Sequence, residues 1–275
     1  MSEQPGEGLN VILTGAARGL GREMALALAL AGFHVGAVDL PGSDAEMENL
    51  LQRARADGTA SRIMPIHGDV TSLDSCARAV ATMIARFGAV HGLINNAALG
   101  PQEVGPMREG HRRGFYQIDP KWWLATTNVN INGPFLMAHA VTPLLVAQGW
   151  GRIVNLVTSY TTMLNRGNAP YGPTKAAMEA ATVVWSRDLE GTGVTVNALL
   201  PGSAANTRMI PDEDFPDRAA LTQPEVMRAP IVWLMSRASD GVTARRFIAK
   251  LWDPKKPLDQ AIAASGAPAG WRTTA

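Results

Sequence analysis

The chain has 275 residues, 46% of them hydrophobic, and a formal net charge of +1. A chain of this size can bury a large core, and its evenly mixed charges exclude a broad electrostatic surface for nucleic acid or anionic membrane. We therefore expect a small-molecule substrate as its partner, and neither nucleic acid nor membrane.

The sequence carries few sorting signals. Cys76 is the only cysteine, which excludes an intrachain disulfide and suits a reducing compartment. Residues 1–8 are polar and glycine-rich, unlike a signal peptide, and no uninterrupted apolar run reaches the roughly eighteen residues of a membrane span. We expect a cytoplasmic protein with a short N-terminal extension, residues 1–8.

The first half of the chain alternates short apolar runs with amphipathic segments. The runs predict strands at 10–14, 33–38, 62–66 and 91–95. Helices are predicted over 19–32, from Ser43 towards Ala56, and over 73–87. Ser43 and Glu46 have the spacing of a capping box at the start of the second helix.

The second half continues the alternation. Helices are predicted at 129–148, with Pro134 in the first turn, and at 170–189 and 224–236, and strands at 152–157 and 194–199. Apolar strands that alternate with helices predict an α/β fold with a parallel sheet covered on both faces. We expect one domain over residues 9–250 and a C-terminal tail over 251–275.

Residues at the strand ends are the first candidates for a binding site, because ligands of parallel sheets bind beyond the carboxyl ends of the strands. Gly15, Gly19 and Gly21 form a turn between the first strand and helix, with Arg18 and Leu20 inside it. Such a turn brings backbone N–H groups and the positive end of a helix against a pyrophosphate.

The choice of dinucleotide depends on two charged residues. Asp39 ends the second strand, where it can accept hydrogen bonds from a ribose diol and would repel a 2′-phosphate. Arg18 could instead reach a 2′-phosphate, or pair with Asp39 or a phosphate oxygen. The sequence favours NAD over NADP.

Two further strand ends extend this predicted site. Asp69 follows the third strand and is placed either to meet an adenine amino group or to cap the helix at Leu73. Asn96 and Ala97 end the fourth strand with short side chains, where the dinucleotide backbone must pass.

Tyr171 and Lys175 stand four residues apart at the start of a predicted helix and so share one face. An ammonium about 4 Å from a phenol, at an effective dielectric of ~20, favours the phenolate by roughly 4 kcal/mol. That is about three pKa units, enough for a proton donor and acceptor near neutral pH. The alternative is a packed tyrosine beside a solvated lysine.

Six motifs follow one another along the chain: Thr14-Gly15-x-x-x-Gly19-x-Gly21, Asp69-Val70, Asn95-Asn96-Ala97, Asn130-x-x-Gly133, Tyr171-x-x-x-Lys175 and Pro201-Gly202. In this order they resemble the short-chain dehydrogenase/reductase family, from Asn10 to about Phe247. The resemblance implies a single Rossmann-like, doubly wound, three-layer α/β/α domain and an NAD(P)-dependent oxidoreductase that transfers a hydride to or from a secondary alcohol or ketone.

The resemblance also implies catalytic roles. Tyr171 would be the general acid/base, Lys175 would lower its pKa and bind the nicotinamide ribose, and Asn130 would hold a relay water. The family places a serine thirteen positions before the tyrosine; here that position is Thr158, with Ser159 next to it. Either hydroxyl could bind the substrate oxygen.

The remaining cofactor contacts implied by the resemblance are Val70, Pro201, Gly202 and Thr207, the last as the residue that binds the carboxamide. No metal is implied. A dinucleotide sensor without catalysis and a lyase without redox chemistry are the alternatives. Both would be expected to lose part of the glycine turn, the tyrosine or the lysine, which are all present.

Three regions depart from the family or extend it. The segment 99–123 is predicted to be a long loop, with Arg108, His111, Arg112 and Arg113 either solvated or forming a basic lip for an acidic or polar substrate. Residues 244–252 replace the usual glycine-rich last strand. Helix 176–189 is apolar on several faces, including Val183, Val184 and Trp185, which indicates a homodimer or homotetramer.

Overall fold

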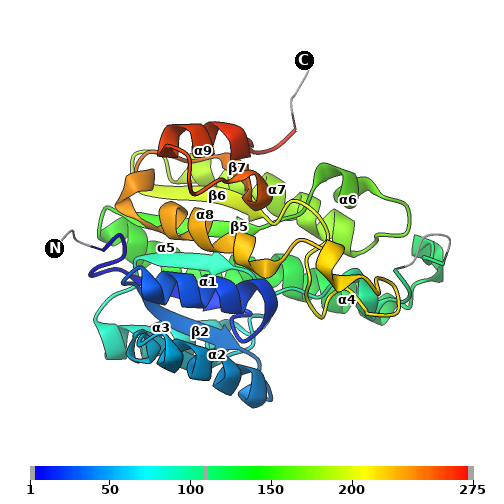
Figure 1. The fold of residues 1–275 in the computed structure, drawn as a ribbon, viewed down its shortest axis with the longest axis horizontal. Helices are drawn as coiled ribbons and strands as arrows, with labels where there is room; N and C mark the ends of the chain where they lie inside the picture. The colour runs from blue at the N-terminus through cyan, green and yellow to red at the C-terminus, as the bar shows by residue number, and fades with distance from the viewer. Residues whose placement is uncertain (1–3, 108–110, 272–275) are drawn as a thin grey trace.

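The computed structural model describes residues 4–107 and 111–271 (Figure 1). Within these residues lies an eight-stranded sheet in the order β3-β2-β1-β4-β5-β6-β7-β8, parallel except for the antiparallel pair β7 and β8. The strands are β1 (Asn10–Thr14), β2 (His34–Asp39), β3 (Ile63–His67), β4 (Gly92–Asn95), β5 (Gly151–Leu156), β6 (Val194–Leu200), β7 (Arg245–Ile248) and β8 (Gly266–Pro268).

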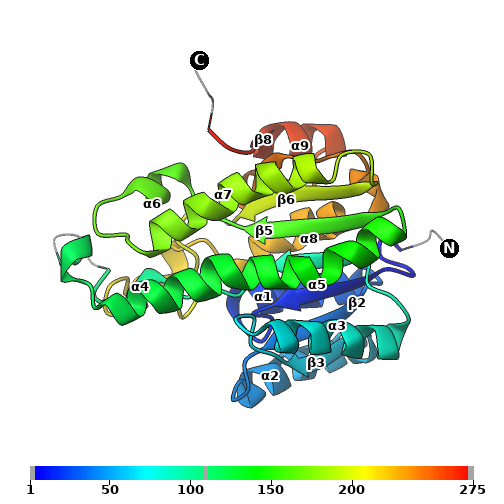
Figure 2. The ribbon, with the colours of Figure 1, turned by 180° about the vertical axis from the view of Figure 1, so that it is seen from behind.

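Helices cover both faces of the sheet, which confirms the predicted three-layer α/β fold (Figures 1 and 2). Alternate strand residues serve the two layers: Val11 and Leu13 pack in one core, and Ile12 packs in the other. One face carries α1 (Gly19–Leu30), α2 (Asp44–Ala56) and α8 (Arg228–Met235); the other carries α3 (Leu73–Phe87), α5 (Gly133–Ala147) and α7 (Tyr171–Asp188).

The helix predicted to begin at 129 begins earlier, so that prediction was wrong. Helix α4 (Pro120–Thr127), a π-helical turn (Asn128–Asn132) and α5 follow one another directly. Asp119 caps α4 by accepting from the N–H of Lys121 at 2.9 Å, and Pro120 occupies its first turn. Asp-Pro resembles a turn signal, although a proline is also well tolerated at the start of a helix.

The continuous helix Pro120–Ala147 is long and apolar enough, by length and composition, to cross a membrane. Core helices of soluble proteins meet the same criteria, and 39% of its most apolar window is buried inside this fold. The C-terminal part of this helix, α5, packs against α3 and the sheet. The helix is therefore weak evidence for a membrane span.

Two local predictions need correction. Ser43 does not form the capping box: its Oγ donates to the carbonyl of Leu40 at 2.8 Å, and no side-chain bond caps α2. The described part of the predicted tail, 251–271, contributes α9 (Leu258–Ser265) and the edge strand β8. Strand β8 pairs with β7, so this segment packs on the sheet.

Candidate active site

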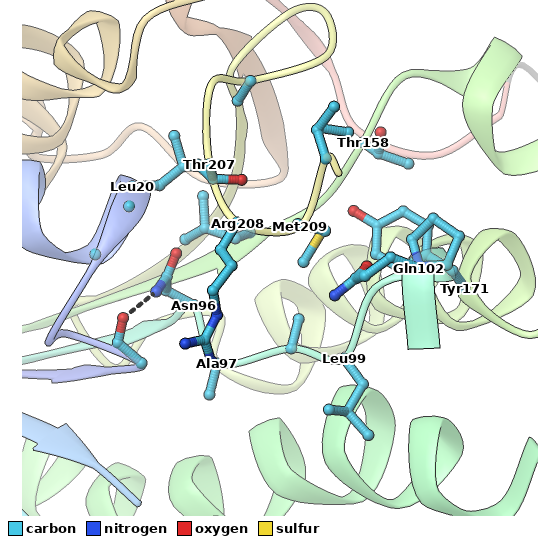
Figure 3. Close-up of a pocket in the computed structure, with 18 of the residues that line it drawn as sticks. Leu20, Asn96, Ala97, Leu99, Gln102, Thr158, Tyr171, Thr207, Arg208 and Met209 are labelled. Carbon is cyan, nitrogen blue, oxygen red and sulfur yellow. Dashed lines mark hydrogen bonds between the residues drawn. The ribbon is translucent and has the colours of Figure 1, made fainter. Parts of the chain in front are cut away.

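A cavity of about 1070 Å³ lies at the carboxyl edge of the parallel strands. Its lining comes from residues that follow β1 to β6, from the first turns of α7, and from the loop after β6 (Figure 3). The structure brings together here all the predicted site residues except Asn130. This is the edge at which ligands bind in open α/β sheets.

The glycine turn between β1 and α1 forms one wall. Gly15 and Gly19 have φ angles of 64° and 55°, which L side chains rarely adopt. A Cβ atom on Gly21 would lie 2.0 Å from the carbonyl oxygen of Gly15, so no larger residue fits there. The turn presents bare backbone at a helix N-terminus, an arrangement that fits a pyrophosphate. Arg18 and Leu20 line the same wall.

Asn96 ties the end of β4 to this turn (Figure 3). Its Nδ2 donates to the carbonyls of Thr14 and Gly15, both at 2.9 Å. The N–H groups of Asn96 and Ala97 donate to Thr14 Oγ1 at 3.0 and 3.1 Å. The sequence indicated only that short side chains are needed here; the structure shows that Asn96 also holds the glycine turn in place.

Asp39 ends β2 as predicted. Its two carboxylate oxygens accept from the N–H groups of Ala17 and Leu40, both at 2.9 Å. These bonds hold the carboxylate of Asp39 at the cavity wall. Arg18 does not pair with Asp39 here; its Nη1 lies 3.5 Å from Glu46 Oε1.

Asp69 and Val70 line the cavity after β3. The carboxylate of Asp69 accepts from the N–H and the hydroxyl of Thr71, at 2.9 and 2.8 Å. It does not cap α3, because Ser72 does so by accepting from the N–H of Ser75 at 3.3 Å. Of the two predicted positions for Asp69, the one on the cavity is found.

Tyr171 and Lys175 face the cavity from the first two turns of α7. Lys175 Nζ donates to the carbonyl of Leu156 at 2.7 Å and lies 5.8 Å from the centre of the Tyr171 ring. Burial lowers the pKa of Lys175 to about 8 and raises the pKa of Tyr171 to about 12, against a smaller lowering by a hydrogen bond with Thr158.

Burial is the largest cause of the raised pKa of Tyr171 in this structure, in which Lys175 donates to Leu156; the activation of Tyr171 by Lys175 stays a prediction. Burial disfavours the charged forms of both side chains. The ammonium of Lys175 donates a hydrogen bond to the carbonyl of Leu156, the last residue of β5. The stabilisation of the phenolate expected from the sequence applies to an ammonium about 4 Å from the phenol at an effective dielectric of ~20. At neutral pH the phenol is protonated and the lysine is mostly charged.

The two hydroxyls after β5 have different neighbours. Ser159 Oγ accepts from the N–H of Thr162 at 3.0 Å and so caps α6 (Tyr160–Leu164). Thr158 lines the cavity together with Tyr171, and its side chain lowers the pKa of the phenol, against the larger effect of burial. Of the two candidates, Thr158 is the one whose side chain acts on the tyrosine, while the Ser159 hydroxyl is engaged in the helix cap.

Asn130 lies in the π-helical turn, fully behind the cavity wall. Its side chain accepts from the N–H of Leu99 at 2.8 Å and donates to the Leu99 carbonyl at 2.9 Å and to Thr174 Oγ1 at 3.1 Å. Pro134 has no N–H to donate to the backbone carbonyl of Asn130, as residue 134 of an α-helix would. The side chain of Asn130 thus joins Leu99, after β4, to Thr174 on α7.

The loop after β6 forms the opposite wall of the cavity. The carbonyl of Pro201 accepts from the N–H of Lys250 at 3.1 Å, and Gly202 has a φ of 111°. Further along, a methyl carbon of Thr207 lies 3.1 Å from where a Cβ atom of Gly19 would stand. Pro201, Gly202 and Thr207 all line the cavity, as predicted.

The next residues of this loop, Arg208 and Met209, also line the cavity, although neither was among the predicted site residues. Arg208 donates to Glu46 Oε1 on α2 at 3.3 Å, and the Met209 side chain lies against Gly100 after β4 (Figure 3). Gln102 also lines the cavity. The positions of these three side chains depend on contacts across the cavity. Their nearness in sequence to Thr207 or to the fourth predicted strand was the only sign that they could belong to the site.

One residue of the predicted basic lip reaches the cavity. Arg112 donates to the carbonyl of Met107 at 2.8 Å and to Asn168 Oδ1 at 3.0 Å, so its guanidinium is held at the wall. His111 and Arg113 do not line this cavity, and Arg108 lies outside the described residues. Across the described ranges, no group of three or more His, Cys, Asp or Glu side chains is placed to hold a metal ion.

Comparison with known proteins identifies the scaffold. The sequence profile described as short chain dehydrogenase matches residues 9–214. The chain belongs to the short-chain dehydrogenase family. A 3-oxoacyl-(acyl-carrier-protein) reductase of Staphylococcus epidermidis is 32% identical over 193 residues, covering 70% of this chain and 74% of the relative. A fluoren-9-ol dehydrogenase of Terrabacter sp. is 29% identical over 272 residues, covering 92% and 74%.

Solved structures agree on the fold. A short-chain dehydrogenase from Shigella flexneri, solved in complex with NADP, has a TM-score of 0.78 at 21% identity and covers 90% of this chain and 100% of its own. A structure from Burkholderia xenovorans reaches a TM-score of 0.75 at 28% identity, covering 87% and 94%. As a short-chain dehydrogenase, this protein is an NAD(P)-dependent oxidoreductase of alcohol or ketone substrates.

Proposed function

We propose that this short-chain dehydrogenase interconverts a secondary alcohol and a ketone, with Tyr171 as the general acid/base and Thr158 as the second hydroxyl on the substrate oxygen. The place of both side chains on one cavity wall, where the Thr158 side chain acts on the Tyr171 phenol, carries the proposal. Two hydroxyls on the same wall can both bond one substrate oxygen.

The dinucleotide fits the residues present. The bare glycine turn, the carboxylate of Asp39 and the walls formed by Asp69, Val70 and Ala97 lie along one continuous cavity. Bound there, the nicotinamide cofactor would donate or accept the hydride. Gly202 and Thr207 would enclose it from the loop after β6.

The chain's own residues handle the proton and the charge. With its pKa raised to about 12, Tyr171 is protonated at neutral pH and can give its proton to a carbonyl oxygen during reduction. Thr158 would orient and stabilise that oxygen. Lys175, charged below pH 8, would favour the phenolate left behind. Asn130 would hold Leu99 in place on the cavity wall through two hydrogen bonds.

The cofactor is proposed to be NAD. Asp39 keeps a negative charge at the end of β2, and Glu46 engages Arg18 and Arg208, the two nearby arginines that could serve a 2′-phosphate. Similar folds bind NADP, as in the Shigella flexneri structure, so the preference depends on these side chains of this chain.

We further propose a homodimer or homotetramer that works in the cytoplasm. Exposed apolar side chains follow one another along α4, α5 and α7, three helices that lie together on one face (Figure 2). Burying them would shield a broad apolar surface from water. They are Trp123, Leu124, Phe135, Val146 and Val184. A monomer by light scattering at micromolar concentration would contradict this.

The activity is tested with the purified protein, NAD and NADP, and a panel of secondary alcohols and ketones, by following the absorbance of the reduced cofactor. Turnover with NAD exceeding turnover with NADP is expected. NADH that quenches the fluorescence of the seven tryptophans without any turnover on the panel would instead support a dinucleotide sensor.

A further inference from the structure

Helix α7 carries a third ionisable side chain beyond Tyr171 and Lys175. Glu179 stands one turn after Lys175, and its side chain is fully buried. Its Oε1 lies 3.2 Å from Nε of Arg246 on β7. Among the described atoms, its Oε2 has no hydrogen-bond partner. A buried carboxylate that is only half satisfied depends strongly on its cation.

Arg246 connects this pair to the proposed substrate hydroxyl. Its Nη2 donates to the backbone carbonyl of Thr158 at 3.1 Å, and its guanidinium stacks over the ring of Tyr160 at 4.0 Å. Only 7% of the Arg246 side chain is exposed. One guanidinium, held between a carboxylate and a ring, thus fixes the backbone that carries the Thr158 hydroxyl.

The C-terminal segment closes the same network. The N–H of Gly270 donates to Glu179 Oε1 at 3.0 Å. The hydroxyl of Tyr160 lies 3.0 Å from the same oxygen and 2.8 Å from the carbonyl of Gly270. Tyr160 also contacts the ring of Trp271, with centroids 6.0 Å apart. Residues of α6, α7, β7 and the segment after β8 therefore meet at one carboxylate.

We propose that the Arg246–Glu179 pair is a positioning device for the reaction: it holds Thr158 at the distance from Tyr171 at which both hydroxyls bond the substrate oxygen. This inference rests on the proposed function. None of the side chains in the pair touches the reacting atoms. Their contribution should appear in kcat, because misplacing one group by about 1 Å can cost about 100-fold in rate.

Arg246→Gln and Glu179→Gln test the pair, and Tyr160→Phe is a milder variant that keeps the ring beneath Arg246 and removes only the hydroxyl. We expect kcat to fall about 10- to 100-fold in the first two and less in the third, with the Kd for NADH unchanged. Glu23→Gln is the matched control. Glu23, on α1, is a similarly buried carboxylate that is bonded to Arg53 and Arg228 and does not line the cavity, so its loss should lower Tm without this selective loss of kcat.

A double-mutant cycle separates positioning from general damage. If Arg246 acts through Thr158, adding Arg246→Gln to a Thr158→Val variant should lower kcat little further. If the two residues act independently, the two losses of kcat should multiply. Multiplying losses, or wild-type kcat in both single variants, would overturn the inference.

Hydrogen exchange provides a measurement that needs no turnover. Both variants should speed exchange in the segment 157–160 while leaving α1 protected. Unchanged exchange there would also overturn the inference. An inactive wild-type protein with this local response would refute the proposed function and still support the positioning role.

Discussion

The two halves of the cavity are built from different materials. The half that follows β1 to β4 is mostly backbone: Gly15 and Gly19 in conformations that exclude side chains, and Asn96 bonded to main-chain carbonyls. The half formed by residues after β5 and by α7 contains the buried Lys175, and the buried Glu179 lies one turn further along α7, outside the cavity lining. Substitutions in the first half should therefore change binding, and substitutions in the second should change protonation and kcat.

The strongest way to break this comparison is Tyr171→Phe. Losing the phenolic proton should lower kcat by about 1000-fold, within the range of general acid/base catalysis, while the Kd for NADH stays the same. Single-turnover absorbance and tryptophan quenching measure the two quantities. Equal losses in both would mean that the ring supports the cofactor wall.

The first half was also the part that could be predicted. The glycine turn, Asp39 and the sheet follow from local patterns, because a strand, a turn and a helix each leave a signature in neighbouring residues. These features depend on sequence neighbours alone. In the second half, Thr158 was implied by the family resemblance, with Ser159 as the alternative.

The second half could be predicted only in part, since its properties depend on contacts between distant segments. The pKa of Tyr171 is raised by burial that no spacing reveals. The pairing of Glu179 with Arg246 joins α7 to β7, and the start of α4 was hidden because Asp119-Pro120 resembles a turn. Charge and helix boundaries therefore needed the tertiary structure.

Lys175→Met, in the second half of the cavity, should have opposite effects on activity and on stability. The pKa of Lys175 is lowered from 10.5 to about 8, so charging it in the folded protein costs roughly 3 kcal/mol, partly offset by its bond to Leu156. We expect Lys175→Met to lose activity and to gain about 2 kcal/mol of unfolding free energy at pH 7.

The sign of this effect predicts its pH dependence. The unfolded chain binds the lysine proton up to about pH 10.5 and the folded chain only up to about pH 8, so wild-type stability rises between those values. The advantage of Lys175→Met should be full below pH 8 and largely gone near pH 10. Urea unfolding at both pH values measures it, with the exposed Lys256→Met as control. A variant less stable at pH 7 would contradict the assignment.

Thr158 and Ser159 offer a comparison within one turn of chain. Thr158→Val should lower kcat/KM about 100-fold, as the loss of one hydrogen bond to a developing oxyanion does. Ser159→Ala removes the cap of α6 and should cost about 1 kcal/mol of stability with little effect on kcat. Steady-state kinetics and thermal unfolding of both variants measure these effects. A large loss of kcat/KM in Ser159→Ala, with little loss in Thr158→Val, would mean that Ser159 binds the substrate oxygen.

The smallest expected effect concerns the cofactor half. Glu46 holds Arg18 from one wall and Arg208 from the other, at 3.5 and 3.3 Å. Glu46→Gln would release both guanidinium groups beside the place where a 2′-phosphate would lie, so the ratio of kcat/KM with NADP to that with NAD should rise. Because the partners are exposed, the rise should be about 3- to 5-fold.

Glu48→Gln is the control for that experiment, because Glu48 lies on the same helix and pairs with Arg55 away from the cavity. The cofactor ratio should not change in this variant. A rise of equal size in both variants would mean that the overall charge of α2, acting at long range, sets the preference. A rise confined to Glu46→Gln would show that selectivity between the dinucleotides depends on the ion pairs of Glu46 with Arg18 and Arg208, even in the half of the cavity that is built mostly from backbone.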